Sequence, residues 1–183
     1  MSNRIQSVDP TSVQGKGKEL LDGIQKGLGK VPNIFRAMVN SPAALQAYLG
    51  FSGALKEGVL SAKLREQIAL AVGQENNCAY CLAAHSAIGK GAGLQDGEIE
   101  AARLGEASDA KDAAAVKLAK AIVKNRGNVT DAELSAARNA GLGDAEITEV
   151  IANVALNIFT NYFNHVADPV VDFPAAKPLA VRV

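Results

Sequence analysis

The amino-acid sequence predicts an all-α protein with a single domain, and its composition, periodicity and length each support this prediction. Alanine is the commonest residue, apolar residues make up 48% of the chain, and aromatic residues make up only 4%. This composition favours closely packed helices over a β-sandwich, which would use more branched and aromatic residues. At 183 residues the chain is long enough to bury one core.

Apolar residues recur at helical spacing along most of the chain, with cap residues and glycines between the segments. We expect Ser41 to be an N-cap with Pro42 at the first helical position. Thr130 and Glu133 have the spacing of a capping box. No segment alternates like a strand, and we expect about eight or nine helices. The expected helical segments are residues 18–28, 40–58, 61–74, 78–93, 94–105, 112–125, 130–141 and 143–168.

The chain is expected to divide into three parts. Residues 1–30 form a leader with one short helix, residues 31–168 form the helical domain, and residues 169–183, with three prolines, form an extended tail. The N-terminus lacks the apolar run of a secretory signal, and no segment is apolar enough to span a membrane. The 19 basic and 19 acidic residues balance without a basic patch. We therefore expect a cytoplasmic protein that binds neither nucleic acid nor a membrane.

Both cysteines of the chain and one of its two histidines lie between Asn77 and His85. If Asn77 is the N-cap of a helix, Cys78, Cys81 and His85 share one narrow stripe of that helix. The stripe begins in the first turn, where unpaired backbone N–H groups and the helix dipole favour a thiolate over a thiol. His85 can then exchange a proton with Cys81. Glu66, at the head of the preceding segment, can reach the stripe if the chain bends between the two segments.

Several roles other than redox chemistry remain open for the cysteine pair. A structural zinc site needs four ligands, and the chain offers only the two cysteines, His85 and the remote His165. A structural disulfide is disfavoured in a reducing compartment, and it would close a very short loop. Buried, inert thiols are a further alternative. His165 is expected to be structural, and residues 160–165 are expected to line a pocket, an oligomer interface or a polar part of the core.

An internal similarity points to a duplicated helical hairpin. When Glu66 is aligned with Glu149, the two cysteines fall on Asn161 and Asn164. One copy of the hairpin would then carry thiols and the other amides. Convergent helix patterning would produce the same similarity, so the alignment leaves both explanations open.

A glutamate, two cysteines and a histidine follow the spacing Glu-x11-Cys-x2-Cys-x3-His. This spacing resembles the signature of the alkylhydroperoxidase D-like proteins of the carboxymuconolactone decarboxylase superfamily. The four residues are Glu66, Cys78, Cys81 and His85. Residues 31–51, 89–94 and 157–174 are also similar to this family, so the resemblance covers most of residues 31–174. It implies an all-helical fold with a duplicated hairpin, assembled into homo-oligomers that are trimers or hexamers.

The resemblance also implies a thiol peroxidase that reduces a small hydroperoxide. Cys81 would be the peroxidatic thiolate, and Cys78 would resolve the resulting sulfenic acid as a disulfide. Glu66 would draw off the Cys81 proton through a water molecule or His85. A dithiol reductant, either a lipoyl or a thioredoxin-like protein, would restore the pair by exchange. No bound cofactor and no metal are expected.

One position departs from the family pattern. Family members with peroxidase activity often have a histidine directly before the second cysteine, where this chain has Tyr80. A phenol is a poor proton relay near neutral pH. Two other functions therefore stay open. One is a non-enzymatic redox sensor, and the other is a decarboxylase of the kind that gives the superfamily its name, although those enzymes generally lack the cysteine pair.

Overall fold

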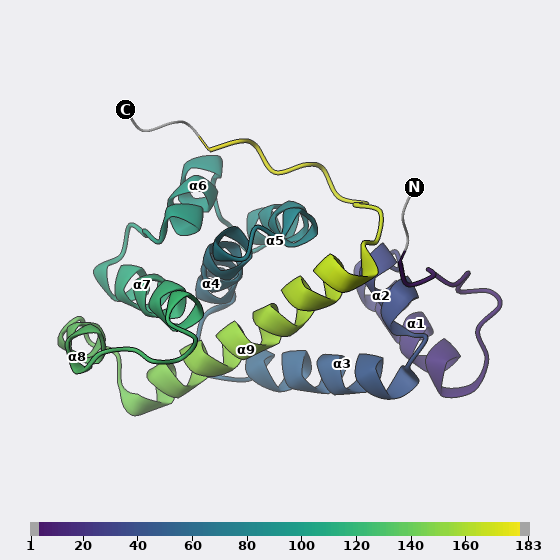
Figure 1. Ribbon diagram of the computed structural model, residues 1–183, viewed down its shortest axis with the longest axis horizontal. Coiled ribbons are helices and arrows are strands. Elements are labelled where there is room, and N and C mark those ends of the chain that lie inside the picture. Colours follow the sequence, from purple (N-terminus) through teal and green to yellow (C-terminus); the bar gives the residue numbers. More distant parts are fainter. Residues whose placement is uncertain (1–3, 180–183) are drawn as a thin grey trace.

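The computed structural model describes residues 4–179, and over this part of the chain it contains nine helices and no strand (Figure 1). The helices are α1 (Gly15–Leu28), α2 (Asn33–Met38), α3 (Pro42–Lys56), α4 (Ala62–Glu75), α5 (Ala79–Gly91), α6 (Asp96–Leu104), α7 (Ala110–Lys124), α8 (Asp131–Asn139) and α9 (Asp144–Ala167). The predicted all-α, single-domain fold is confirmed. Residues 1–3 of the predicted leader and 180–183 of the predicted tail lie outside the described residues. None of the described helices is both long enough and apolar enough to cross a bilayer.

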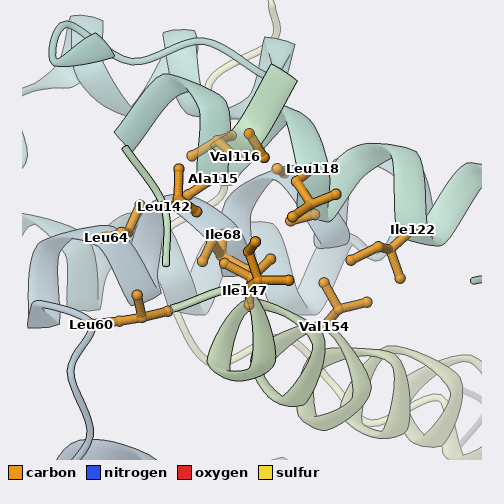
Figure 2. Packing of buried hydrophobic residues seen from close by; sticks show 14 of the residues in the cluster. Leu60, Leu64, Ile68, Ala115, Val116, Leu118, Ile122, Leu142, Ile147 and Val154 are labelled. Atoms are coloured by element: carbon orange, nitrogen blue, oxygen red, sulfur yellow. The ribbon is translucent and has the colours of Figure 1, made fainter. Parts of the chain in front are cut away.

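Helix α4 is the central element, and it packs against α5, α6, α7 and α9 (Figure 1). Figure 2 shows Ile68 of α4 enclosed by side chains from α7 and α9. Burying a branched side chain of this size completely stabilises the fold by about 1.5–3 kcal/mol. The core cluster consists of Leu60, Leu64, Ile68, Ala71, Val72, Ala115, Val116, Leu118, Ala119, Ile122, Ala137, Leu142, Ile147, Val150 and Val154. This cluster fixes α4, and therefore the position of Glu66 on it.

A second apolar cluster encloses both cysteines between α1, α2, α3 and the start of α5. Its members are Leu21, Ile24, Ile34, Phe35, Met38, Val39, Leu45, Cys78, Tyr80, Cys81 and Ala84. The short helix α2 contributes to this cluster and was not predicted, because its six residues are too few to show a helical period. The cysteine pair therefore lies in apolar surroundings and not on the protein surface.

The bend between α4 and α5 is a helix C-cap followed at once by an N-cap. Asn77 has a left-handed φ of 53°, and its N–H donates to the Gln74 carbonyl. The N–H of Cys78 donates to the Gly73 carbonyl, which completes a Schellman motif. Asparagine is one of the few residues besides glycine that tolerate this left-handed position. Cys78 then caps α5, because its Sγ accepts the N–H of Cys81 at 3.3 Å. The prediction of Asn77 as the N-cap is wrong by one residue, because Asn77 ends α4.

The other predicted caps are confirmed. Ser41 caps α3 through its side chain, and Pro42 occupies the first turn. Thr130 and Glu133 form the predicted capping box at the start of α8, with the Thr130 N–H donating to Glu133 Oε2 at 2.7 Å. Local side-chain chemistry thus sets these helix starts.

The two segments of the predicted duplication differ in shape. The bend at Asn77 divides the first segment into α4 and α5, whereas α9 runs without a break. Glu149, the counterpart of Glu66, accepts the N–H groups of Val59 and Leu60 at 2.8 and 3.1 Å and so holds the loop before α4. The duplication stays a prediction, and within the described residues only the first segment bends.

After α9 the chain runs in extended form past α5 towards α6 (Figure 1), and we call residues 169–179 the strap. The Arg103 guanidinium of α6 donates to the Lys177 carbonyl at 2.5 Å. Lys177 Nζ lies 2.7 Å from Asp96 Oδ2, also on α6. The strap is therefore tied to the helical body at its far end.

Candidate active site

The two cysteines meet in the first turn of α5. Cys78 and Cys81 form a disulfide, and only 1% and 3% of their surfaces are exposed. Cys81 lines a cavity, and Cys78 lies behind it in the apolar cluster. The start of α5 directs unpaired N–H groups and the positive end of its dipole at this pair. The arrangement presents the sulfur of Cys81 to a ligand, with Cys78 within bonding reach.

Two buried amides of α9 face the cysteine sulfurs. Asn161 Nδ2 donates to Cys81 Sγ at 3.0 Å, and Asn164 Nδ2 donates to the same sulfur at 3.2 Å. Asn76 Nδ2 donates to Asn161 Oδ1 at 2.8 Å, which fixes the end of the Asn161 amide that faces the sulfur. Donors of this kind stabilise a thiolate more than a thiol. The alignment of the asparagines with the cysteines was the only sequence signal of this contact, which arises because α9 packs across α5.

Glu66 and His85 form a pair beside the cysteines. His85 Nδ1 lies 2.8 Å from Glu66 Oε2, and both side chains are largely buried. A carboxylate can only accept, so Nδ1 carries the hydrogen of this bond. Glu66, His85 and Cys81 line the same cavity. The structure therefore brings all four predicted site residues together, and within the described residues no hydrogen bond joins Glu66 or His85 to a cysteine sulfur.

The cavity in front of Cys81 has a volume of about 910 Å³ and lies between α1–α5 and α9. Its walls are mainly apolar, and sequence reasoning missed its polar members Tyr48, Asn153 and Asn157. Thr160 and Asn164 also line it, and they belong to residues 160–165, for which a pocket was one of the expected roles. Burial, and secondly the charge of Glu66, raise the pKa of Tyr48 to about 12. The Tyr48 phenol therefore keeps its proton at neutral pH.

Tyr80, between the two cysteines, anchors the strap. Its hydroxyl donates to Asp172 Oδ1 at 2.6 Å and accepts the N–H of Ile34 at 3.2 Å. Its ring meets Phe173 edge-on, with the centroids 5.8 Å apart, and Lys30 Nζ lies 3.9 Å from the centroid of the Phe173 ring. Burial, and secondly the hydrogen bond to Asp172, raise the pKa of Tyr80 well above its usual value. The hydroxyl is thus committed to structural partners and is not available as a proton relay.

Within residues 4–179, no group of three or more His, Cys, Asp or Glu side chains is arranged to hold a metal ion. His165 is exposed near the end of α9 and is not among the residues that line the cavity. The structure does not bring this histidine to the cysteine pair.

The chain was compared with protein families and with known proteins. Residues 42–125, which include Glu66, both cysteines and His85, match the model of the carboxymuconolactone decarboxylase family. A comparison with curated proteins gave no match.

Solved structures with the same fold include three proteins of low sequence identity. The first is a peroxidase-related protein from Ralstonia eutropha JMP134, described as an alkylhydroperoxidase AhpD core, with 22% identity, a TM-score of 0.83 and 92% of each chain covered. A peroxidase-related protein from Silicibacter sp. TM1040 has 21% identity and a TM-score of 0.78, over 91% of this chain and 88% of that one. The debrominase Bmp8, as a cysteine-to-alanine variant in complex with 2,3,4-tribromopyrrole, has 18% identity and a TM-score of 0.80, over 94% of this chain and 93% of that one.

The family match spans α3 to α7, and the structural matches extend the same architecture over almost the whole chain. These findings show that residues 42–125 match the carboxymuconolactone decarboxylase family and that the chain has the all-helical fold of the two peroxidase-related proteins.

Proposed function

We propose that this protein is a thiol peroxidase that reduces organic hydroperoxides with Cys81 and Cys78. The observation that carries the proposal is the setting of the Cys81 sulfur. It lines a large cavity, accepts hydrogen bonds from two buried amides and is bonded to Cys78. A low-energy thiolate next to a resolving cysteine is what peroxide reduction requires.

In the first step, the Cys81 thiolate attacks the terminal oxygen of the hydroperoxide. The O–O bond breaks, its electron pair leaves on the alkoxide oxygen, and Cys81 becomes a sulfenic acid. Cys78 then attacks the Cys81 sulfur as a thiolate, and the hydroxide leaves as water after taking a proton. The product is the disulfide that links the two cysteines in the structure.

The Glu66–His85 pair supplies the route for the proton. Glu66 holds Nδ1 of His85 at 2.8 Å, so Nε2 is free to accept the proton of the Cys81 thiol. The same proton is then returned to the departing alkoxide, which leaves as an alcohol. Two amides at the sulfur take the place of a relay group at Tyr80, because they lower the energy of the thiolate directly.

A dithiol must reduce the disulfide by exchange. The cavity is the approach to the Cys81 sulfur, and both sulfurs are almost fully buried. A slender dithiol arm such as a lipoyl group therefore suits the site better than the flat surface of a thioredoxin-like protein. We place the reaction in the cytoplasm, where such dithiols are kept reduced.

We also propose that the protein is a homo-oligomer, a trimer or a hexamer. Helix α9 carries an exposed apolar stripe that consists of Ile151, Phe159, Tyr162 and Val166, with exposed fractions of 51%, 42%, 56% and 61%. Phe51 on the neighbouring α3 is also exposed. A contiguous apolar surface of this kind typically marks an interface between protein chains.

The test is a thiol count combined with turnover. Purified, reduced protein is treated with tert-butyl hydroperoxide, and free thiols are titrated before and after a dithiol is added. We expect peroxide to remove both free thiols and the dithiol to restore them. With the dithiol present, we expect the protein to consume peroxide over repeated cycles. If both thiols stay titratable after excess peroxide, the peroxidase proposal is wrong.

Two single substitutions separate the roles of the cysteines. Cys81→Ser should abolish peroxide consumption, whereas Cys78→Ser should leave a sulfenic acid on Cys81 that dimedone traps. Equal, partial losses from both substitutions would overturn the assignment of roles.

The same variants distinguish the rival functions. A redox sensor would be oxidised once and would not sustain turnover with a dithiol. A decarboxylase would retain its activity in both serine variants. Because the debrominase Bmp8 has the same fold, 2,3,4-tribromopyrrole belongs in the substrate panel, and its debromination in preference to peroxide reduction would redirect the assignment.

A further inference from the structure

Two cations line the cavity at a distance from the cysteines, and they indicate which hydroperoxides it accepts. We propose that the cavity binds hydroperoxides that carry a carboxylate at the far end of an apolar chain, and that Arg65 and Lys56 bind this carboxylate. The inference rests on the proposed peroxidase function and names its substrate class.

Neither cation is neutralised within the described part of the protein. Arg65 and Lys56 form no ion pair with an acidic side chain there. Arg65 Nη1 donates to the Leu60 carbonyl at 2.5 Å, which orients the guanidinium and leaves its other donors available. The acidic member of the lining, Glu66, is already paired with His85. The cavity therefore has two positive charges to offer to an anion.

Arg65 and the Cys81 sulfur lie at different levels of the cavity. A Cβ placed on Gly73 of α4 would lie 3.5 Å from Cys81 Cβ, so this level of α4 is next to the reacting sulfur. Arg65 lies eight residues earlier on the same helix, which corresponds to about 12 Å along its axis. A substrate that reaches both sites must be elongated.

The walls of the cavity are suited to an apolar chain. Leu49 and Leu55 of α3, Ile88 of α5 and Leu156 of α9 are among its lining residues. Burial of apolar area favours binding, so a hydrocarbon chain gains affinity here, whereas hydrogen peroxide gains none. A planar guanidinium also matches a carboxylate by paired N–H···O bonds. An oxidised fatty acid combines these three features.

The reacting end follows the same chemistry as any hydroperoxide. The O–O bond breaks, Cys81 is oxidised to the sulfenic acid, and the hydroperoxide is reduced to the hydroxy acid with the proton returned by His85. The carboxylate stays intact and serves only to position the chain.

The experiment compares linoleic acid hydroperoxide with its methyl ester in a dithiol-coupled assay. The ester keeps the chain and the reacting group but lacks the negative charge. We expect kcat/KM for the acid to exceed that for the ester by about tenfold in the wild-type protein. The double substitution Arg65→Gln and Lys56→Gln should bring this ratio close to one. Lys117→Gln removes an exposed cation of α7 remote from the cavity lining and should retain the wild-type ratio.

Using a ratio within each variant cancels any effect of a substitution on the thiol chemistry. Circular dichroism checks that the variants are folded. An equal rate for acid and ester in the wild-type protein, or a ratio that survives the double substitution, would overturn the inference.

A binding measurement separates this inference from the peroxidase proposal. Calorimetric titration of the oxidised protein with dodecanoate and with dodecanol requires no turnover. Preference for dodecanoate, lost in the double variant, supports the carboxylate site even if tert-butyl hydroperoxide is not reduced and the peroxidase proposal fails. Equal binding of the acid and the alcohol counts against the site even if peroxide is reduced.

Discussion

At the scale of single residues, the amides of Asn161 and Asn164 are the feature that most changes the chemistry of the cysteine pair. Both are almost fully buried, and both donate to Cys81 Sγ. A hydrogen bond to a charged acceptor contributes about 1.5–3 kcal/mol. These bonds therefore favour the reactive form of the sulfur without any proton relay between the cysteines.

Removing one of these donors should make the Cys81 thiolate harder to form. In a Cys78→Ser background, Asn161→Leu is expected to shift the pH midpoint of Cys81 alkylation upwards and to slow alkylation at neutral pH roughly tenfold. The pH dependence of the reaction with iodoacetamide measures this. Asn157→Leu is the matched control, since its amide donates to the Asn153 carbonyl and not to a sulfur. An unchanged alkylation profile in Asn161→Leu would contradict the role of the amide.

At the scale of secondary-structure elements, the bend between α4 and α5 places the cysteines. Asn77 is exposed and contributes its backbone conformation to the Schellman motif. Because the bend has no extra residues, Cys78 becomes the N-cap of α5, and the stripe with Cys81 and His85 faces the cavity. The geometry of the site thus depends on one left-handed residue.

We expect Asn77→Ala to destabilise the protein by about 1–2 kcal/mol, because alanine pays the steric cost of a left-handed φ. Asn77→Gly should change the free energy of unfolding by no more than a few tenths of a kcal/mol. Urea denaturation of the reduced proteins measures both values. Equal destabilisation by alanine and glycine would show that the side chain, and not φ, matters at this position.

The strap is held by Tyr80, and its release gives a second prediction at this scale. Tyr80→Phe removes the bond to Asp172 and leaves the Ile34 N–H without its acceptor, at a cost of about 1–3 kcal/mol. Amide hydrogen exchange of residues 169–177 should therefore accelerate. Protection in residues 64–72 of the core should stay unchanged and serves as the internal control. Unaltered exchange in the strap would mean that other contacts hold it.

The raised pKa of Tyr80 also determines how the stability of the protein changes with pH. An unfolded tyrosine loses its proton near pH 10, whereas the folded Tyr80 keeps it at that pH. Its contribution to stability is therefore complete below about pH 10 and falls as pH rises further, because only the unfolded chain has been deprotonated. The decline of stability with alkaline pH should be shallower in Tyr80→Phe.

At the scale of the whole molecule, the central α4 belongs to the first apolar cluster, the cysteines belong to the second, and the cavity lies where the second cluster meets α9. The outer face of α9 remains apolar and exposed. One helix therefore supplies the amides of the site on its inner face and the proposed interface between chains on its outer face.

A charge placed on that outer face should dissociate the proposed oligomer. We expect the double substitution Tyr162→Glu and Val166→Glu to convert the wild-type oligomer into monomers in sedimentation velocity, since both side chains are more than half exposed in the single chain. Ser135→Glu on the exposed side of α8 is the control and should leave the assembly intact. A monomeric wild-type protein would contradict the proposal directly.

Local sequence signals accounted for most of the helices, and the four residues predicted as a site lie near one another in the structure. Capping residues such as Ser41 and Thr130 act on their own helix, so their effect can be inferred without knowledge of the fold. Asn77 was misassigned because an asparagine can serve both as an N-cap and as a left-handed C-cap residue, and sequence alone does not distinguish these roles. The short α2 was not predicted, because its six residues are too few to show a helical period.

The contacts of Tyr80 were not predicted, and those of the asparagines were indicated only by their alignment with the cysteines, for a different reason. Tyr80 bonds to Asp172, which is 92 residues away, and Asn161 reaches Cys81 across 80 residues. No local pattern encodes such a separation. These contacts depend on how α9 packs against α5 and on the path of the strap past α5.

The sequence by itself determined that the protein is helical, that its two thiols share a helix start with His85, and that Glu66 precedes them at the family spacing. These properties follow from periodicity, capping and residue order, which are local. Only the tertiary structure decided that two amides donate to the Cys81 sulfur, that Tyr80 secures the strap, and that Arg65 and Lys56 line the same cavity as Cys81. Those features arise from packing between elements distant in sequence, and burial gives them their energetic weight.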